Sequence, residues 1–259
     1  MLKIQTLNNI SVQGLNRLPR ELYEVASDIA QPDAVLVRSA DMHKMEIPAS
    51  IKAIGRAGAG TNNIPVAAMS KRGVPVFNAP GANANAVKEL VLAGMLLAAR
   101  NIGPALDFVR KLDGDDKALH EAVEAGKKKF VGFELPGRSL GVIGLGAIGV
   151  KLANAAVELG MDVWGFDPAM TVNNAWKLDA RVRQALSVDD LMARSQFVSV
   201  HVPLIDATRG LINADRLKLM KKQGVVLNFA RAGIVDEAAM IEALDAGKMH
   251  AYVCDFPSN

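Results

Sequence analysis

One glycine-rich segment limits what this chain can fold into more than any other part of the sequence. Residues 140–149 read LGVIGLGAIG, so three glycines lie between an apolar run and an alanine-rich stretch with helical spacing. Gly144 permits a tight turn, Gly146 lets the backbone approach a pyrophosphate at a helix N-terminus, and Gly149 lets that helix lie close to the strand. The segment therefore predicts the strand–turn–helix of a dinucleotide-binding unit.

An acidic residue stands where such a unit needs one. Asp167 directly follows the next apolar run, residues 162–166, at the spacing of about 20 residues typical of the motif. Its carboxylate can accept hydrogen bonds from an adenosine ribose and would repel a 2′-phosphate, and residues 168–170 contain no cation. We therefore expect NAD rather than NADP as cofactor. The alternative is a strand–helix turn that binds nothing, because glycine-rich turns occur wherever a chain reverses.

Composition narrows the class of protein. The chain has 259 residues, 50% of them hydrophobic, which is enough for a large core and two domains. A formal charge of +3 with both signs mixed along the chain indicates no nucleic-acid partner, although it suits a small anion. A single cysteine fits a reducing compartment. Without an apolar run that could span a bilayer or form a signal peptide, we expect a soluble cytoplasmic protein and no membrane partner.

Short apolar runs alternate with helical patterns in both halves of the chain, which is typical of parallel sheets covered by helices. In the first half we expect strands at residues 3–7, 34–37, 51–55 and 74–77, and helices at 19–26, 65–71 and 84–100. After a polar helical stretch at 103–129, we expect strands at residues 140–143, 162–166, 197–202, 225–229 and 251–254. The helices between these later strands are expected at 148–159, 188–194, 214–219 and 237–246, with Gly160 and Gly247 as C-terminal caps.

This alternation predicts an α/β protein with two doubly wound parallel-sheet domains. We expect a flavodoxin-like substrate-binding (catalytic) domain at residues 1–98 and a Rossmann NAD-binding domain at 99–259. Ligands of such sheets bind beyond the carboxyl ends of the strands. In the first half, cationic and glycine-rich residues follow strands at Arg38 and at residues 56–60; in the second half they follow at residues 230–233. Two such edges facing one cleft would enclose a cofactor and a small anion.

Several segments carry a family resemblance. Residues 228–237, NFARAGIVDE, and 55–64, GRAGAGTNNI, together with the glycine turn, resemble the D-isomer-specific 2-hydroxyacid dehydrogenases. With VRS at 37–39 and VFNAP at 76–80, the chain looks most like members that act on D-3-phosphoglycerate. The resemblance, from about residue 35 to 259, implies an NAD-dependent enzyme that oxidises D-3-phosphoglycerate to 3-phosphohydroxypyruvate, the first step of L-serine biosynthesis.

The resemblance also implies roles for individual residues. Arg231 matches the catalytic arginine that binds the substrate carboxylate and polarises the C2 oxygen, a task that suits a planar guanidinium. The implied substrate-binding residues are Arg38, Arg56, Ala59, Gly60 and Asn83. The implied cofactor-binding residues are Gly144, Gly146, Ala147, Ile148, Gly149, Asp167, Val202, Pro203, Thr208, Phe229, Ala230, Arg231 and Asp255. We expect no metal.

One part of the family's machinery has no match in this sequence. Oxidation of a 2-hydroxy acid needs a base for the hydroxyl proton, which in the family is a histidine positioned by a glutamate. None of the four histidines, His43, His120, His201 and His250, lies in the expected motif. We expect that pair to lie beyond Asn259, the chain to be C-terminally incomplete, and its turnover to be much reduced.

Other functions stay open from the sequence. The chain could be a glyoxylate or hydroxypyruvate reductase of the same family, an NAD-sensing module like the family's transcriptional corepressors, or a dinucleotide-binding fold without a substrate. The resemblance implies a homodimer or homotetramer. Residues 127–129, three lysines, could assist a phosphate across a subunit interface, but such charge runs are usually solvated.

Overall fold

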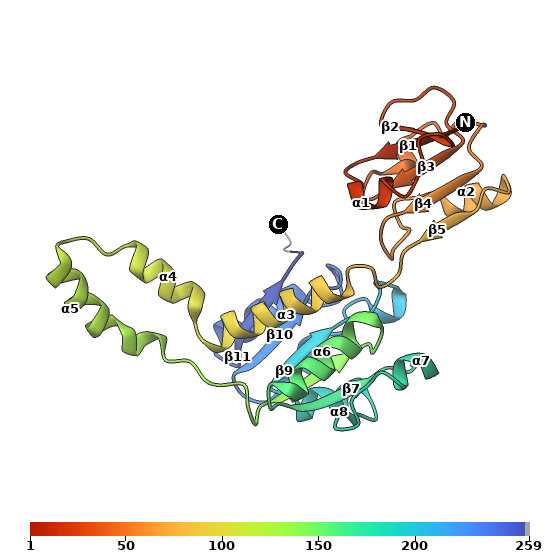
Figure 1. Ribbon diagram of the computed structural model, residues 1–259. Helices are drawn as coiled ribbons and strands as arrows, with labels where there is room; N and C mark the ends of the chain where they lie inside the picture. Colours follow the sequence, from red (N-terminus) through yellow and green to blue (C-terminus); the bar gives the residue numbers. More distant parts are fainter. Residues whose placement is uncertain (257–259) are drawn as a thin grey trace. The chain divides into compact units, whose positions relative to one another are not determined.

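The computed structural model describes residues 1–256 and divides the chain into two compact units, Met1–Asn83 and Ala84–Asn259. Each unit is built on one parallel sheet (Figure 1). The boundary lies earlier than the expected one at residues 98/99, because helix α3 (Ala84–Ala99) packs on elements of the second unit. Its buried face, which includes Val91 and Met95, belongs to the same apolar core as that unit's sheet.

The first unit contains a five-stranded sheet in the order β2-β1-β3-β4-β5. Its strands are β1 (Leu2–Leu7), β2 (Tyr23–Ala26), β3 (Ala34–Val37), β4 (Ala53–Arg56) and β5 (Val76–Asn78). This is the flavodoxin-like order, as the sequence predicts. The helical segments are α1 (Val12–Leu15), η1 (Met42–Lys44) and α2 (Val66–Lys71), and Val37, Ile54 and Met69 lie in the core.

The helix expected at residues 19–26 is wrong. Only a short turn forms there, in which the backbone N–H groups of Leu22 and Tyr23 donate to the carbonyl of Pro19. The chain then extends as β2, which pairs in parallel with β1 through Leu2↔Tyr23 and Ile4↔Val25. An aromatic and a β-branched residue at alternate positions favour a strand, and pairing at the sheet edge outweighs the weak helical pattern.

The second unit contains a six-stranded sheet in the order β11-β10-β9-β6-β7-β8. Its strands are β6 (Ser139–Ile143), β7 (Asp162–Phe166), β8 (Arg183–Gln184), β9 (Phe197–Val200), β10 (Gly224–Asn228) and β11 (Met249–Cys254). When the strands are numbered within this unit, their order is that of the Rossmann fold. The strand order reverses between β6 and β9, which are neighbours in the sheet. The sequence predicts all of these strands except β8, whose two residues are too few to show a pattern.

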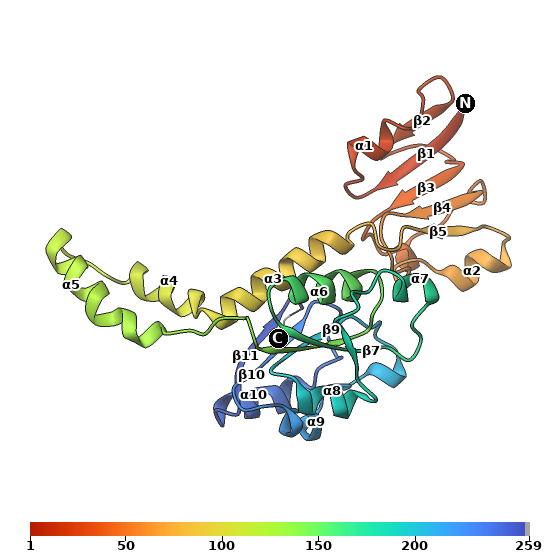
Figure 2. The same ribbon diagram turned by 60° about the horizontal axis from the view of Figure 1, so that its bottom comes forward.

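Helices cover both faces of this sheet (Figure 2). Helices α3 and α6 (Ala147–Glu158) pack together over one face, and α8 (Val188–Arg194), α9 (Ala214–Leu219) and α10 (Glu237–Asp245) cover the other. Along β10, Val225 and Leu227 enter the first core and Val226 the second. Gly160 and Gly247 lie two residues after the last residues of α6 and α10, and both have a positive φ, as expected where a helix is capped at its C-terminus.

The remaining segments lie outside these layers. Helices α4 (Ile102–Arg110) and α5 (Asp116–Gly126), with η2 (Lys127–Phe130), form a hairpin that extends from the end of α3 (Figure 2). The rings of Phe108 and Phe130 pack within it, 5.3 Å apart. Two short segments, α7 (Val172–Ala175) and η3 (Asp206–Thr208), lie in loops of the second unit. In residues 1–256 no single helix could cross a membrane by length and hydropathy; α3 and α4 qualify only as a pair bent by 66°.

Candidate functional site

Two glycines of the turn after β6 are required by the protein's own packing. Gly144 has a φ of +93°, and a Cβ atom there would lie 2.7 Å from the carbonyl oxygen of His201. A Cβ atom at Gly149 would lie 1.9 Å from the carbonyl oxygen of Gly144. The turn therefore touches the loop after β9 on one side, and its own helix on the other, at distances that only glycine permits.

Gly146 differs from these two glycines. It is the N-cap of α6, it has a negative φ, and a Cβ atom there would have nothing within 4 Å. Packing within residues 1–256 therefore gives no reason for glycine at this position. A ligand that approaches the first turn of α6 would give such a reason, because a side chain at residue 146 would obstruct it. Ala147 and Ile148 begin this helix, and its free N–H groups and dipole attract an anion. The residues present fit a dinucleotide pyrophosphate.

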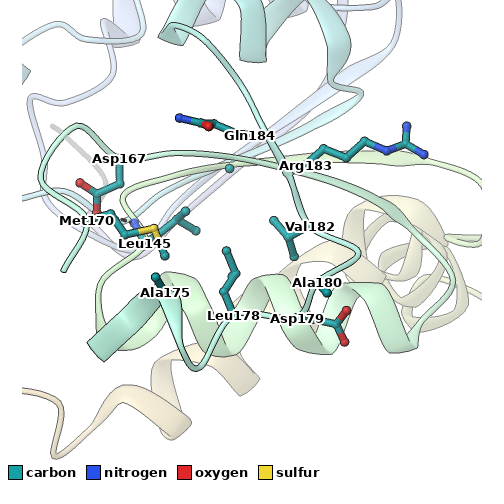
Figure 3. A pocket seen from close by; sticks show the side chains of 11 residues that line it. Leu145, Asp167, Met170, Ala175, Leu178, Asp179, Ala180, Val182, Arg183 and Gln184 are labelled. Atoms are coloured by element: carbon teal, nitrogen blue, oxygen red, sulfur yellow. Dashed lines mark hydrogen bonds between the residues drawn. The ribbon is translucent and has the colours of Figure 1, made fainter. Parts of the chain in front are cut away.

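Asp167 follows β7 and is held by the backbone beside the glycine turn. Its Oδ2 accepts from the N–H of Leu145 at 2.8 Å, and its Oδ1 accepts from the N–H of Ala169 at 2.8 Å. Asp167 also lines a cavity of about 360 Å³ with Met170, Leu178 and Arg183 (Figure 3). Arg183 points away from Asp167 in this view, and its guanidinium lies 5.6 Å from the centre of the Trp164 ring.

The loop after β9 lies next to the glycine turn because β6 and β9 are neighbours. It contains Val202 and Pro203, and Thr208 closes it: the Thr208 hydroxyl donates to the Pro203 carbonyl at 2.5 Å and accepts from the Ile205 N–H at 2.9 Å. The structure thus brings the residues implied for the adenosine half to the same sheet edge as Gly144, where the strand order reverses. That edge is where doubly wound sheets bind their ligands.

His201 begins this loop, and its imidazole is largely buried. Its Nε2 lies 2.8 Å from the hydroxyl of the buried Ser199, and its buried Nδ1 has no hydrogen-bond partner among the described residues. Burial lowers the pKa of His201 to about 4, so the ring is neutral at physiological pH.

Arg231 and Asp255 lie in the loops that follow two adjacent strands, β10 and β11. The guanidinium of Arg231 donates to the carbonyl of Ala230 at 2.6 Å and lies 5.9 Å from the ring centre of Phe256. The N–H of Asp255 donates to the carbonyl of Asn228 at 3.1 Å. Between the strand and Arg231, the side chain of Phe229 is buried in the core beside Gly94 of α3.

Asn228 holds the loop after β10 through hydrogen bonds, a role that the sequence does not predict. It ends β10, is 0% exposed, and its amide hydrogen-bonds to the main chain of both Ala230 and Arg231. The signal was a polar residue at the end of an otherwise apolar buried strand, GVVLN. Buried amides must be hydrogen-bonded, so such a residue has to shape the loop that follows it.

The first unit collects its implied substrate residues at one edge of its sheet. Arg38 follows β3, Arg56 ends β4, and Ala59 and Gly60 follow β4, while Asn83 is exposed just before α3. Asparagines again hold the loops. The Asn8 Oδ1 accepts from the N–H groups of Ser39 (3.0 Å) and Ala40 (2.5 Å), Asn63 donates to Ala40 (2.8 Å), and Asn78 donates to Ala59 (2.7 Å).

The guanidinium of Arg56 lies over Gly58, where an added Cβ atom would come within 1.9 Å of its Nη1. Glycine therefore lets Arg56 fold over this loop. Within residues 1–256, no three His, Cys, Asp or Glu side chains gather in a way that could hold a metal ion.

The fold and the site of the second unit define a dinucleotide-binding α/β protein. A family model described as "D-isomer specific 2-hydroxyacid dehydrogenase, NAD binding domain" matches residues 92–259. The chain therefore belongs to the D-isomer specific 2-hydroxyacid dehydrogenase family, and its second unit carries the NAD-binding domain.

Named relatives agree with this family. The chain is 36% identical over 235 residues to a D-3-phosphoglycerate dehydrogenase of Methanocaldococcus jannaschii, which covers 90% of this chain and 42% of the relative. It is 37% identical over 251 residues to the enzyme of that name from Archaeoglobus fulgidus, covering 96% and 45%. A hydroxypyruvate reductase of Thermotoga maritima is 36% identical over 231 residues, covering 88% and 70%. The chain thus spans less than half the length of the first two relatives.

Solved structures support the fold. The apo form of Rhodotorula graminis D-mandelate dehydrogenase matches with a TM-score of 0.82 at 24% identity, covering 98% of this chain and 81% of that one. Apo D-lactate dehydrogenase from Escherichia coli matches with a TM-score of 0.76 at 23% identity, covering 98% and 82%. Both likenesses extend over nearly the whole chain and support its α/β fold.

Proposed function

We propose that this chain is the NAD- and substrate-binding part of an NAD-dependent D-2-hydroxyacid dehydrogenase that oxidises D-3-phosphoglycerate to 3-phosphohydroxypyruvate, the first step of L-serine biosynthesis. The observation that carries the proposal is the position of Arg231. It follows β10 at the same sheet edge as the glycine turn, in a loop fixed by Asn228. A cation held there lies on the nicotinamide side of a dinucleotide whose pyrophosphate sits on α6.

In this proposal, separate residues of the second unit contact the pyrophosphate, the ribose, the carboxamide and the substrate carboxylate. The first turn of α6 holds the pyrophosphate, and Asp167 accepts from the ribose. Asp255 accepts from the carboxamide. Arg231 binds the substrate carboxylate in a bidentate manner and stabilises negative charge on the C2 oxygen. NAD, when bound, supplies the hydride acceptor.

The first unit carries the other residues for which we propose contacts with an anion. Arg38 and Arg56 carry the charge, and the N–H groups of Ala59 and Gly60 face a carboxylate from a loop that Asn78 holds. Two arginines at one edge of the first unit's sheet suit a ligand that carries a phosphate as well as a carboxylate better than one with a single charge, which favours the phosphorylated substrate.

The second candidate is a hydroxypyruvate reductase. The observation that favours it is the relative from Thermotoga maritima, 70% of whose length this chain covers. Because hydroxypyruvate lacks a phosphate, the two candidates differ in whether the first unit's arginines discriminate between phosphorylated and unphosphorylated ligands.

The test compares ligands in the presence of saturating NAD, by isothermal titration calorimetry on this chain. We expect D-3-phosphoglycerate to bind more tightly than D-glycerate, and Arg38→Ala or Arg56→Ala to remove most of that preference. Arg231→Ala should weaken both ligands about ten- to a hundredfold, as expected when a charge-assisted hydrogen bond is lost. Arg17→Ala, an exposed arginine of the first unit, is the matched control. Equal affinity for the two ligands would favour the reductase.

We also propose that the chain forms a homodimer through the α4–α5 hairpin. The support is an apolar stripe on α4, in which Ile102, Leu106 and Val109 are spaced so that they share one face and are exposed. A homotetramer would need a second such surface.

A further inference from the structure

The side chain of Asn228 is fixed from three directions. Its Oδ1 accepts from the N–H of Ala230 at 3.2 Å, and its Nδ2 donates to the carbonyl of Arg231 at 2.9 Å and to the hydroxyl of Tyr252 at 3.3 Å. These bonds engage the amide oxygen and both amide hydrogens. The orientation of the amide is therefore determined, since a flipped amide would place donor against donor.

Tyr252 supplies the contact that does not belong to the Arg231 loop. It lies on β11, beside β10, where Val226 pairs with Tyr252 and Asn228 pairs with Cys254. Burial raises the pKa of Tyr252 to about 12, with smaller effects from Asn228, Cys254 and Glu237. The phenol is therefore neutral throughout the physiological range and remains an acceptor for Asn228.

The main chain of Asn228 reaches the second functional loop. Its carbonyl accepts from the N–H of Asp255 at 3.1 Å. One buried residue thus contacts both Ala230–Arg231 and Asp255, the two loops that the proposed function places around the nicotinamide and the substrate carboxylate. Small shifts of these loops would change how the Arg231 guanidinium meets a carboxylate, because bidentate binding depends on its orientation.

We propose that Asn228 and Tyr252 are positioning residues for the carboxylate site: Tyr252 fixes the amide of Asn228, and Asn228 fixes the main chain of Arg231 together with Asp255. This inference rests on the proposed function, because it takes Arg231 as the group that binds the carboxylate. Tyr252 thereby joins the residues that support the carboxylate site. It lies on the face of the sheet opposite α3 and α6, where it packs against the core beneath α8, α9 and α10.

The variant Tyr252→Phe tests the pair with little risk to folding, because it removes only the hydroxyl. Oxalate serves as the carboxylate probe on the chain saturated with NADH. We expect the variant to bind oxalate about three- to tenfold more weakly, the range for loss of one neutral hydrogen bond, and to bind NADH alone nearly as well as before. The matched control is Tyr23→Phe on β2 of the first unit, the only other tyrosine of the chain.

Tyrosine labelled with ¹³C at Cζ gives a second readout. With two tyrosines in the chain, Tyr252→Phe assigns the two resonances directly. Addition of oxalate to the NADH complex should shift the Tyr252 resonance and leave that of Tyr23 in place, and a purely structural role for Tyr252 would not produce this shift.

The outcomes are distinguishable. If oxalate binds the wild type, but Tyr252→Phe leaves its affinity unchanged and the Tyr252 resonance does not move, the positioning role is overturned while the proposed function stands. If the wild type does not bind oxalate even with NADH, the role of Arg231 fails, and the positioning role fails with it.

Discussion

Burial keeps the His201 imidazole neutral, and this makes the protein's stability depend on pH. In the folded protein the pKa of His201 is about 4, against an ordinary value of 6.5. Between these values the unfolded chain binds a proton that the folded protein does not, so stability falls as the pH drops through this window. The full effect, reached below pH 4, is about 3 kcal/mol.

Urea unfolding at pH 7 and pH 4.5 measures this dependence. We expect His201→Gln to lose much less stability between the two pH values than the wild type, because glutamine does not titrate. His120→Gln, at an exposed position on α5, is the control and should behave like the wild type. Equal pH dependence in all three proteins would show that His201 does not titrate as its burial implies.

At the scale of one element, different glycines of the turn serve stability and cofactor binding: Gly149 is needed for packing, and Gly146 is proposed to leave space for the pyrophosphate. In Gly149→Ala the new Cβ would lie 1.9 Å from a backbone oxygen, so α6 and β6 must separate, which costs on the order of 1–3 kcal/mol. In Gly146→Ala the new Cβ meets no protein atom within 4 Å. We expect this variant to keep its Tm but to bind NADH about tenfold or more weakly, because the methyl group takes the space of the pyrophosphate.

Thermal unfolding and NADH fluorescence titration separate the two glycines. Gly103→Ala on α4, where a Cβ atom also meets nothing within 4 Å, is a control without a ligand site. A lower Tm for Gly146→Ala, together with unchanged NADH affinity, would mean that this glycine serves the fold and not the cofactor.

The elements that could be predicted from the sequence are those whose own residues determine them. The run before Gly144 is buried on both faces, and Gly160 and Gly247 end helices through their positive φ, so a local pattern suffices. Strand β2 depends instead on pairing with β1, whose residues precede their partners by 21 positions (23 − 2 for Leu2↔Tyr23), and β8 consists of two residues. Pairing partners of this kind are not visible in a local window.

The candidate site divides in the same way. Arg231, Asp167 and the glycines are recognisable because their chemistry is tied to their place after a strand. Asn8, Asn63, Asn78 and Asn228 are not, because each acts on a loop that is distant in the sequence or needs a specific amide orientation. Each loop proposed to bind the substrate's anionic groups is thus held by a side-chain amide, in both units. An amide can fix a main chain beside an anion without adding a charge that would compete for it.

At the scale of the whole molecule, the apolar stripe of α4 predicts self-association. Leu106 and Val109 are 49% and 53% exposed, and a single-chain protein gains nothing from presenting them to water. The other side of the hairpin is already used, because Phe108 packs on Phe130 and over Gly126. A second copy of the chain could cover the stripe through a two-fold axis, the commonest arrangement for homo-oligomers.

Sedimentation velocity tests this prediction. We expect the wild type to sediment as a dimer at micromolar concentration, and the double variant Leu106→Glu, Val109→Glu to sediment as a monomer, because two carboxylates cannot be buried unpaired in an apolar contact. Ile241→Glu, on α10 at 58% exposure, is the matched control and should remain a dimer. NADH affinity should be unchanged in the monomeric variant, because the glycine turn and Asp167 lie on other elements. A wild type that sediments as a monomer, or a double variant that remains dimeric, would assign the stripe another role.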